Sequence, residues 1–157
     1  MQQATSVSDL TRSNRTLVMG IVNVTEDSFS DGGRWLDFDA AINHARELVA
    51  QGADMIDVGG ESTRPGAVRV EADVEERRVV PVIQALSKLG IRTSVDTMRA
   101  STAQAAAEEG VDMINDVSAG LADPEVSGQL RAQAFEITGT GPDEPVKVGV
   151  AVVGGPR

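Results

Sequence analysis

The chain has 157 residues, of which 41% are hydrophobic, and this is enough for one domain with a sizeable core and argues against disorder. The absence of cysteine excludes disulfides, thiolate metal sites and cysteine nucleophiles. A formal net charge of −10 argues against nucleic acid and anionic membranes as partners, but a few donors and a metal can still hold an anionic small ligand. No apolar run approaches the ~20 residues of a membrane span. Residues 1–16 lack the apolar core of a signal peptide, so we expect a cytoplasmic protein.

Four short apolar runs alternate with helical patterns along the chain. We expect strands at residues 16–22, 54–58, 91–95 and 111–114. We expect helices from Asp37 or Asp39 to Gln51, and over residues 72–89, 101–109 and 124–133. Regular alternation of strand and helix predicts a parallel sheet.

The first two helical patterns are amphipathic. The first has Asp as its N-cap, and its apolar stripe consists of Ile42, Ala45, Leu48 and Val49. The second is expected to bury Val79, Val82, Ile83 and Leu86. Pro81 lies inside the second pattern and should kink this helix or mark its true start. His44, the only histidine, is expected at a surface or half-buried helical position and not in catalysis.

Each expected strand ends in residues that can bind a ligand, namely Asn23, Asp57, Asp96 and Asn115. All four therefore lie at one carboxyl-terminal rim, which favours a (β/α) barrel over a doubly wound sheet. A complete barrel takes ~250 residues, so we expect a partial (β/α)8 TIM barrel of about four βα units.

This barrel domain is expected to span residues 16–133, after a loose arm of residues 1–15. Residues 134–157 have a different composition, with two β-like runs around a Gly/Pro turn. They predict either a β-hairpin or a tail of low information content.

Four segments of the sequence resemble motifs of a known family. The segment Val18-Met-Gly-Ile-Val-Asn-Val-Thr-Glu-Asp-Ser-Phe-Ser-Asp-Gly-Gly33 resembles the first signature of the dihydropteroate synthase family, and Asp57-Val-Gly-Gly-Glu-Ser-Thr-Arg-Pro-Gly66 resembles its second. Ser94-Val-Asp-Thr97 and Ile114-Asn-Asp-Val117 are similar to its third and fourth strand ends. The resemblance covers about residues 16–127. One departure is Glu26, where the family usually has proline.

The resemblance implies an enzyme of folate biosynthesis that joins 6-hydroxymethyl-7,8-dihydropterin pyrophosphate to p-aminobenzoate and releases pyrophosphate. It implies Mg²⁺ to neutralise the leaving group, with Asn23 as the metal ligand of the protein. The alternative for Asn23 is a loop cap.

The resemblance also assigns a loop to the substrates. Thr63, Arg64 and Pro65 are expected to contact pyrophosphate and help form the p-aminobenzoate pocket, with Phe29 as a further apolar wall. The guanidinium of Arg64 suits phosphate or carboxylate; in isolation it would be read as a surface charge.

Asp96 and Asn115 are expected to bind the pterin, because a carboxylate beside an amide can read its alternating donor and acceptor edge. Asp96 would also stabilise the positive charge that develops on the pterin methylene. The competing interpretation is that Asp96 caps the following helix.

The family's later rim carries a further aspartate, a lysine and an Arg-x-His segment, and none has a counterpart here. The chain therefore resembles the N-terminal half of the enzyme with an atypical end, as from truncation or a reading-frame change. We expect weak or no activity from this chain alone, and self-association through exposed barrel edges. The alternative function is a non-catalytic pterin-binding fragment or a pterin-binding methyltransferase-type module.

Overall fold

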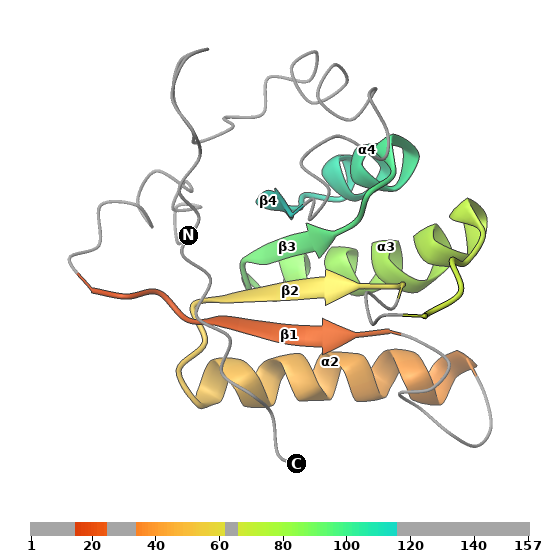
Figure 1. Cartoon of the computed structure of the whole chain (residues 1–157). Coiled ribbons are helices and arrows are strands. Elements are labelled where there is room, and N and C mark those ends of the chain that lie inside the picture. Colours follow the sequence, from red (N-terminus) through yellow and green to blue (C-terminus); the bar gives the residue numbers. More distant parts are fainter. Residues whose placement is uncertain (1–14, 25–33, 62–65, 116–157) are drawn as a thin grey trace, which may run out of the picture.

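The computed structural model describes residues 15–24, 34–61 and 66–115. Within these ranges strands and helices alternate along the chain (Figure 1), in the order β1 (Met19–Asn23), α2 (Arg34–Ala50), β2 (Met55–Gly59), α3 (Ala72–Lys88), β3 (Thr93–Asp96), α4 (Ala100–Glu108) and β4 (Met113–Asn115). The expected alternation is therefore confirmed over these elements.

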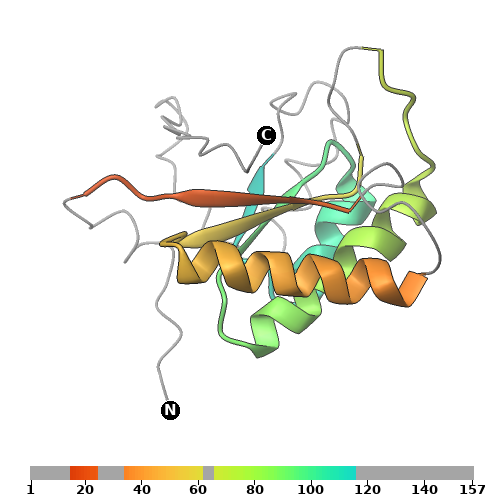
Figure 2. The same ribbon diagram turned by 90° about the horizontal axis from the view of Figure 1, so that it is seen from below.

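The four strands form one parallel sheet in the order β1-β2-β3-β4. Figure 2 shows that α2, α3 and α4 all lie on the same side of this sheet. A doubly wound sheet would carry helices on both faces and would place its strands in a different order. Sequential strand order with helices on one face is the arrangement of a (β/α) barrel, so the fold is a partial TIM barrel as predicted.

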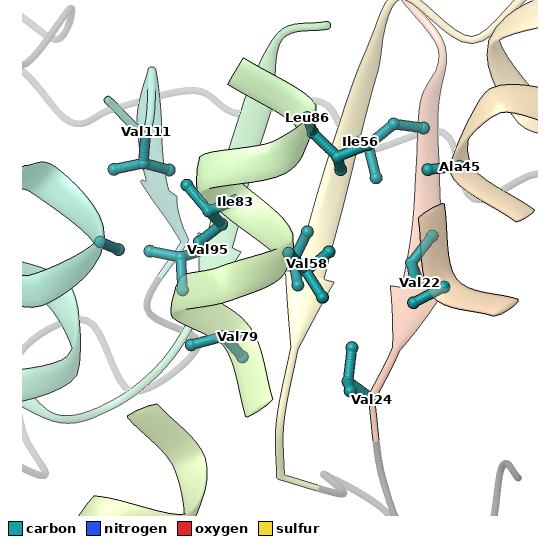
Figure 3. Packing of buried hydrophobic residues seen from close by; sticks show 13 residues of the cluster. Val22, Val24, Ala45, Ile56, Val58, Val79, Ile83, Leu86, Val95 and Val111 are labelled. Atoms are coloured by element: carbon teal, nitrogen blue, oxygen red, sulfur yellow. The ribbon is translucent and has the colours of Figure 1, made fainter. Parts of the chain in front are cut away.

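The core lies between the sheet and the helices. Because side chains alternate along a strand, Val22, Ile56, Val58 and Val95 point to the helix-covered face. They pack against the buried stripe of α3, which is the one predicted: Val79, Val82, Ile83 and Leu86. Figure 3 shows Val79, Ile83 and Leu86 of α3 beside Ile56 and Val58 of β2 and Val95 of β3.

The opposite face of the sheet is here called the open face. The strand register places on it, from β1 to β4, Met19, Ile21 and Asn23, then Met55, Asp57 and Gly59, then Ser94 and Asp96, then Met113 and Asn115. Its polar residues gather toward the carboxyl-terminal ends of the strands, and its methionines toward the other end.

The same pair of hydrogen bonds from an aspartate occurs twice at the amino-terminal edge of the sheet. The N–H of Asp54 donates to the carbonyl of Val18 at 2.8 Å, and the carboxylate Oδ2 of Asp54 accepts the N–H of Val18 at 2.9 Å. Asp112 does the same with Thr93, at 3.0 and 2.8 Å. Each aspartate thus holds both backbone groups of a residue at or just before the start of the preceding strand, and we call these two pairs the aspartate clamps.

Several details of the sequence-based expectations are wrong. The strands mostly begin and end one or two residues later than predicted. Asp37 and Asp39 lie inside α2, so neither is its N-cap. Val49 is 37% exposed, while Ala41 takes its place in the core. Pro81 does not start α3, because it lies inside this helix, which runs from Ala72 to Lys88.

His44 is half-buried on α2, as expected. The expected helix at residues 124–133, the tail at 134–157 and most of the terminal arm lie outside the described residues. Within the described ranges, no helix is both long enough and apolar enough to span a membrane.

Candidate functional site

The carboxyl-terminal ends of the strands bring three of the predicted site residues together. The register aligns Asn23 with Gly59, Gly59 with Asp96 and Asp96 with Asn115. The four residues therefore form one row across all four strands, on the open face. The predicted gathering of Asn23, Asp96 and Asn115 at one edge of a contiguous parallel sheet is confirmed.

Gly59 leaves a gap in this row. A Cβ atom at that position would lie 3.7 Å from Oδ1 of Asn23 and 3.7 Å from Oδ2 of Asp96. The amide oxygen and the carboxylate oxygen thus approach the same small space from the two neighbouring strands. This space, which we call the Gly59 slot, is open because residue 59 has no side chain.

Asp96 is not the N-cap residue of the following helix. The N-cap residue of α4 is Arg99, whose own side chain makes no capping hydrogen bond. Asp96 ends β3 at the position that faces the slot.

Asp57 was expected at the end of its strand, but it lies one row below, in the middle of β2, and is only 3% exposed. Its Oδ2 accepts a hydrogen bond from Nδ2 of Asn115 at 3.4 Å. Burial raises the pKa of the Asp57 carboxyl above its usual range, and the polar side chains of Ser94 and Asn115 oppose that shift. A carboxylate thus lies beneath the row of site residues.

A buried ion network supports the same edge from the helix side. Glu75 on α3 is fully buried and contacts the hydroxyl of Thr97 and the guanidinium of Arg99. Arg99 also reaches Oε2 of Glu61 at 3.4 Å and the carbonyl of Val70. The network therefore ties the segments that follow β2 and β3 to the first turn of α3.

Glu61 adds a second link to the same network. Its Oε1 accepts the backbone N–H of Val70 at 3.2 Å and contacts Nε of Arg69 at 3.3 Å. Glu61 and Val70 flank residues 62–65 in the sequence, so the network fixes the chain on both sides of that segment.

Four predicted site residues lie outside the described residues: Phe29, Thr63, Arg64 and Pro65. Their expected roles, and the ligand roles of Asn23, Asp96 and Asn115, stay predictions.

Sequence reasoning missed the supporting residues Glu75 and Arg99. A signal for Glu75 was present, because position 75 precedes Val79, Val82 and Leu86 at helical spacing and so lies on the buried stripe. A carboxylate on an apolar stripe requires a buried partner. No comparable signal marked Arg99, because its partners are far apart in the sequence.

The site offers oxygen ligands and a planar recognition edge. Among the described residues, no group of three or more His, Cys, Asp and Glu side chains could hold a metal ion, so these residues form no all-protein cage. Two oxygens at the Gly59 slot suit a hard cation that keeps water and phosphate as its other ligands. Beside them, the carboxylate of Asp96 and the amide of Asn115 offer acceptors and a donor in a fixed row.

Comparison with known proteins agrees with this geometry. The family described as pterin binding enzyme matches residues 19–137. Dihydropteroate synthase of Mycobacterium leprae is 55% identical over 107 residues, which are 68% of this chain and 38% of that protein.

The chain is also similar to solved structures of dihydropteroate synthases. Dihydropteroate synthase of Xanthomonas albilineans with 4-aminobenzoic acid is 46% identical, with a TM-score of 0.72 over 78% of this chain and 45% of that one. The same enzyme in complex with 7,8-dihydropteroate is 42% identical, with a TM-score of 0.66 over 76% and 43%. The chain thus spans less than half the length of each of these three relatives. With a family match over most of its length and the signature residues aligned on one sheet edge, the chain belongs to the pterin binding enzyme family.

Proposed function

We propose that this chain carries the pterin-binding half of a dihydropteroate synthase site. That enzyme condenses 6-hydroxymethyl-7,8-dihydropterin pyrophosphate with p-aminobenzoate in folate biosynthesis. The observation that carries the proposal is the row of Asn23, Asp96 and Asn115 in register across the strand ends. The similarity to relatives solved with 4-aminobenzoic acid and with 7,8-dihydropteroate supports the same substrate classes.

In this proposal Asp96 and Asn115 bind the pterin ring. The ring carries amino and ring N–H donors next to acceptors, and it needs partners of both kinds in one plane. Asp96 accepts from a donor, and Asn115 supplies an acceptor and a donor. The negative charge of Asp96 also stabilises the positive charge that forms on the pterin methylene as pyrophosphate leaves.

Asn23 would hold Mg²⁺ through its Oδ1, with Asp96 Oδ2 on the other side of the Gly59 slot. Bound there, Mg²⁺ supplies charge neutralisation for the pyrophosphate leaving group. Asn23 ends an outer strand of the described sheet and its side chain is exposed, so water and phosphate can complete the coordination.

The p-aminobenzoate end of the site is proposed from Thr63, Arg64 and Pro65 of the second signature. Arg64 offers two parallel N–H donors to a carboxylate or a phosphate, and Thr63 adds a hydroxyl. Pro65 and Phe29 would supply apolar walls for the benzoate ring. The Glu61–Arg99–Glu75 network fixes Glu61 and Val70, which flank this segment in the sequence.

Calorimetric titration of the purified 157-residue chain with 6-hydroxymethyl-7,8-dihydropterin pyrophosphate and Mg²⁺ tests the proposal. We expect saturable binding that Asp96→Asn weakens by ~1–3 kcal/mol, because a buried donor of the ligand then loses its acceptor. Asp73→Asn is the matched control, because Asp73 is an exposed carboxylate in the first turn of α3.

Two results would overturn the proposal. One is the absence of any binding by a folded wild-type chain. The other is an equal effect of Asp96→Asn and Asp73→Asn, since only the first lies at the candidate site.

A further inference from the structure

Asp57 is a buried carboxylate whose burial the fold does not explain. It is 3% exposed, and its Oδ1 has no hydrogen-bond partner in the described part of the chain. The hydroxyl of Ser94, its neighbour in register on β3, lies close enough to oppose the effect of burial on Asp57, but makes no hydrogen bond of good geometry there. A buried carboxylate with an unused oxygen costs free energy of folding.

Glu75 shows the contrast. It is as deeply buried as Asp57, but each of its two oxygens contacts a partner, Thr97 or Arg99. Glu75 therefore has the contacts of a structural carboxylate, and Asp57 does not. A strongly buried, incompletely satisfied acid next to a candidate site points to a role in that site.

The side-chain hydrogen bond between Asp57 and Asn115 leads to the site. Its Oδ2 accepts from Nδ2 of Asn115 at 3.4 Å, between residues 58 positions apart. Asn115 aligns with Asp96 at the strand ends. Asp57 thus contacts a predicted pterin-binding residue from below, one row toward the middle of the sheet.

The contact with Asp57 fixes the orientation of the side-chain amide of Asn115. An asparagine side chain turned by 180° exchanges its oxygen and nitrogen, and many environments accept both orientations. A carboxylate has no hydrogen to donate, so it selects the orientation in which Nδ2 faces Asp57. Oδ1 of Asn115 and the second hydrogen on Nδ2 are then directed elsewhere in a constant order.

We propose that Asp57 is a positioning residue that sets the orientation of the Asn115 amide for a planar heterocycle with a donor and acceptor edge. This inference rests on the proposed function of the row of site residues. Asp57 acts through Asn115 and does not itself touch the ligand.

A double-mutant cycle tests the proposal on the full chain, with 6-hydroxymethyl-7,8-dihydropterin pyrophosphate and Mg²⁺ as the probe. Asp57→Leu keeps the number and branching of the side-chain heavy atoms and removes the acceptor. We expect it to weaken binding about tenfold in the wild-type background and less than about twofold in the Asn115→Ala background, because the two residues act as one unit.

The expected effect of Asp57→Leu on stability is opposite to its expected effect on binding. Asp57→Leu removes an unsatisfied buried carboxylate, so the free energy of unfolding should stay the same or rise. Loss of affinity without loss of stability is a result that a merely structural role would not give. Asp54→Asn is the matched control: it breaks an aspartate clamp at the other end of the sheet, and should lower stability and leave affinity unchanged.

The proposal is overturned if Asp57→Leu leaves affinity unchanged, or weakens binding equally in both backgrounds. If the wild-type chain binds no pterin pyrophosphate, the proposed function fails, and a second measurement on the ligand-free chain still decides the contact. The side-chain NH₂ signal of Asn115 in ¹⁵N NMR, assigned by its loss in Asn115→Ala, should shift as Asp57 is titrated.

Asp96 is the other titratable residue on the open face of the described strands, so it must be separated from Asp57. The shift of the Asn115 signal should disappear in Asp57→Leu and persist in Asp96→Asn. The reverse pattern would show that Asn115 is held by Asp96, and it would overturn the proposal.

Discussion

At the scale of single residues, we expect substitutions of the adjacent Gly59 and Gly60 to have different effects, one on binding and one on stability. A Cβ on Gly59 would meet Cβ of Asp96 at 3.6 Å and Oδ1 of Asn23 at 3.7 Å, which are ordinary contacts. A Cβ on Gly60 would meet Cγ1 of Val79 at 3.0 Å and the backbone oxygen of Glu75 at 3.2 Å, which is too close for a rigid core.

Gly59→Ala should therefore fold normally and fill the Gly59 slot. We expect pterin pyrophosphate with Mg²⁺ to bind about tenfold more weakly, because ~1–3 kcal/mol is a usual cost of placing a methyl group in an occupied space. Gly60→Ala should lose ~1–3 kcal/mol of stability instead. Titration calorimetry and urea unfolding of both variants measure the two effects, and similar behaviour of the two would contradict the assignment of the slot.

Asp54 and Asp57 should affect the pH dependence of stability in opposite directions. The hydrogen bond from Arg15 is the main reason why the pKa of Asp54 lies below its ordinary value of 3.8, so its contribution to stability is present above that value and is lost as pH falls through the folded-state pKa. Burial raises the pKa of Asp57, so its contribution is present below 3.8 and is lost as pH rises through the folded-state pKa.

Urea unfolding between pH 3 and pH 8 checks these signs. Relative to wild type, Asp54→Asn should lose least at the acid end, and Asp57→Leu should gain most at the neutral end. Parallel stability curves for all three proteins would show that neither carboxyl changes its pKa on folding.

At the scale of elements, α3 is the support of the candidate site. Its buried stripe packs on β2 and β3, and Glu75 connects it to the segments after both strands. Glu75→Ala would leave the 18%-exposed guanidinium of Arg99 with only the longer contact to Glu61 among its described carboxylate partners.

We expect Glu75→Ala to destabilise the chain by ~3 kcal/mol, as breaking a buried ion pair does. The control is Asp73→Ala, which removes an exposed pair with Arg77 on the same helix and should cost ~0.5 kcal/mol or less. Guanidinium unfolding of the two variants measures the difference, and equal losses would mean that the network contributes no more than a surface pair.

The elements also show what a sequence can predict. The stripe of α3 and the polar strand ends were predictable, because each depends on the period of one helix or strand. The wrong prediction for Val49 depended on neighbours, because the path of α2 over the sheet leaves this residue exposed. The contact between Asp57 and Asn115 depends on the register of three strands, which no single segment contains.

At the scale of the whole molecule, the helices of the described part lie on one side of the sheet. β1 and β4 are the outer strands of the described sheet, and Ile21 on the open face is 37% exposed. Strand edges and an apolar face are surfaces through which sheets pair. We expect the 157-residue chain to self-associate, and light scattering behind size exclusion should show species larger than the 16.4 kDa monomer. A monodisperse monomer at all concentrations would contradict this.

Turnover by this chain alone should be far below that of the longer relatives. The later lysine, arginine and histidine of the resembled family have no counterpart in the chain, and one such electrostatic donor is worth ~10²–10³ in rate. Pyrophosphate release that depends on added p-aminobenzoate is the measurement. Robust release by a monomer would show that the residues present are sufficient.

The aspartate clamps bear on how such a fold can change during evolution. Asp54 and Asp112 set strand register at the amino-terminal end of the sheet, whereas Asn23, Asp96 and Asn115 lie at the other end. A mutation that alters the chemistry at the carboxyl-terminal edge therefore removes neither clamp. The residues of the clamps and those of the candidate site lie at opposite ends of the strands. Substitutions that change ligand specificity can therefore arise without loss of the contacts that the clamps make.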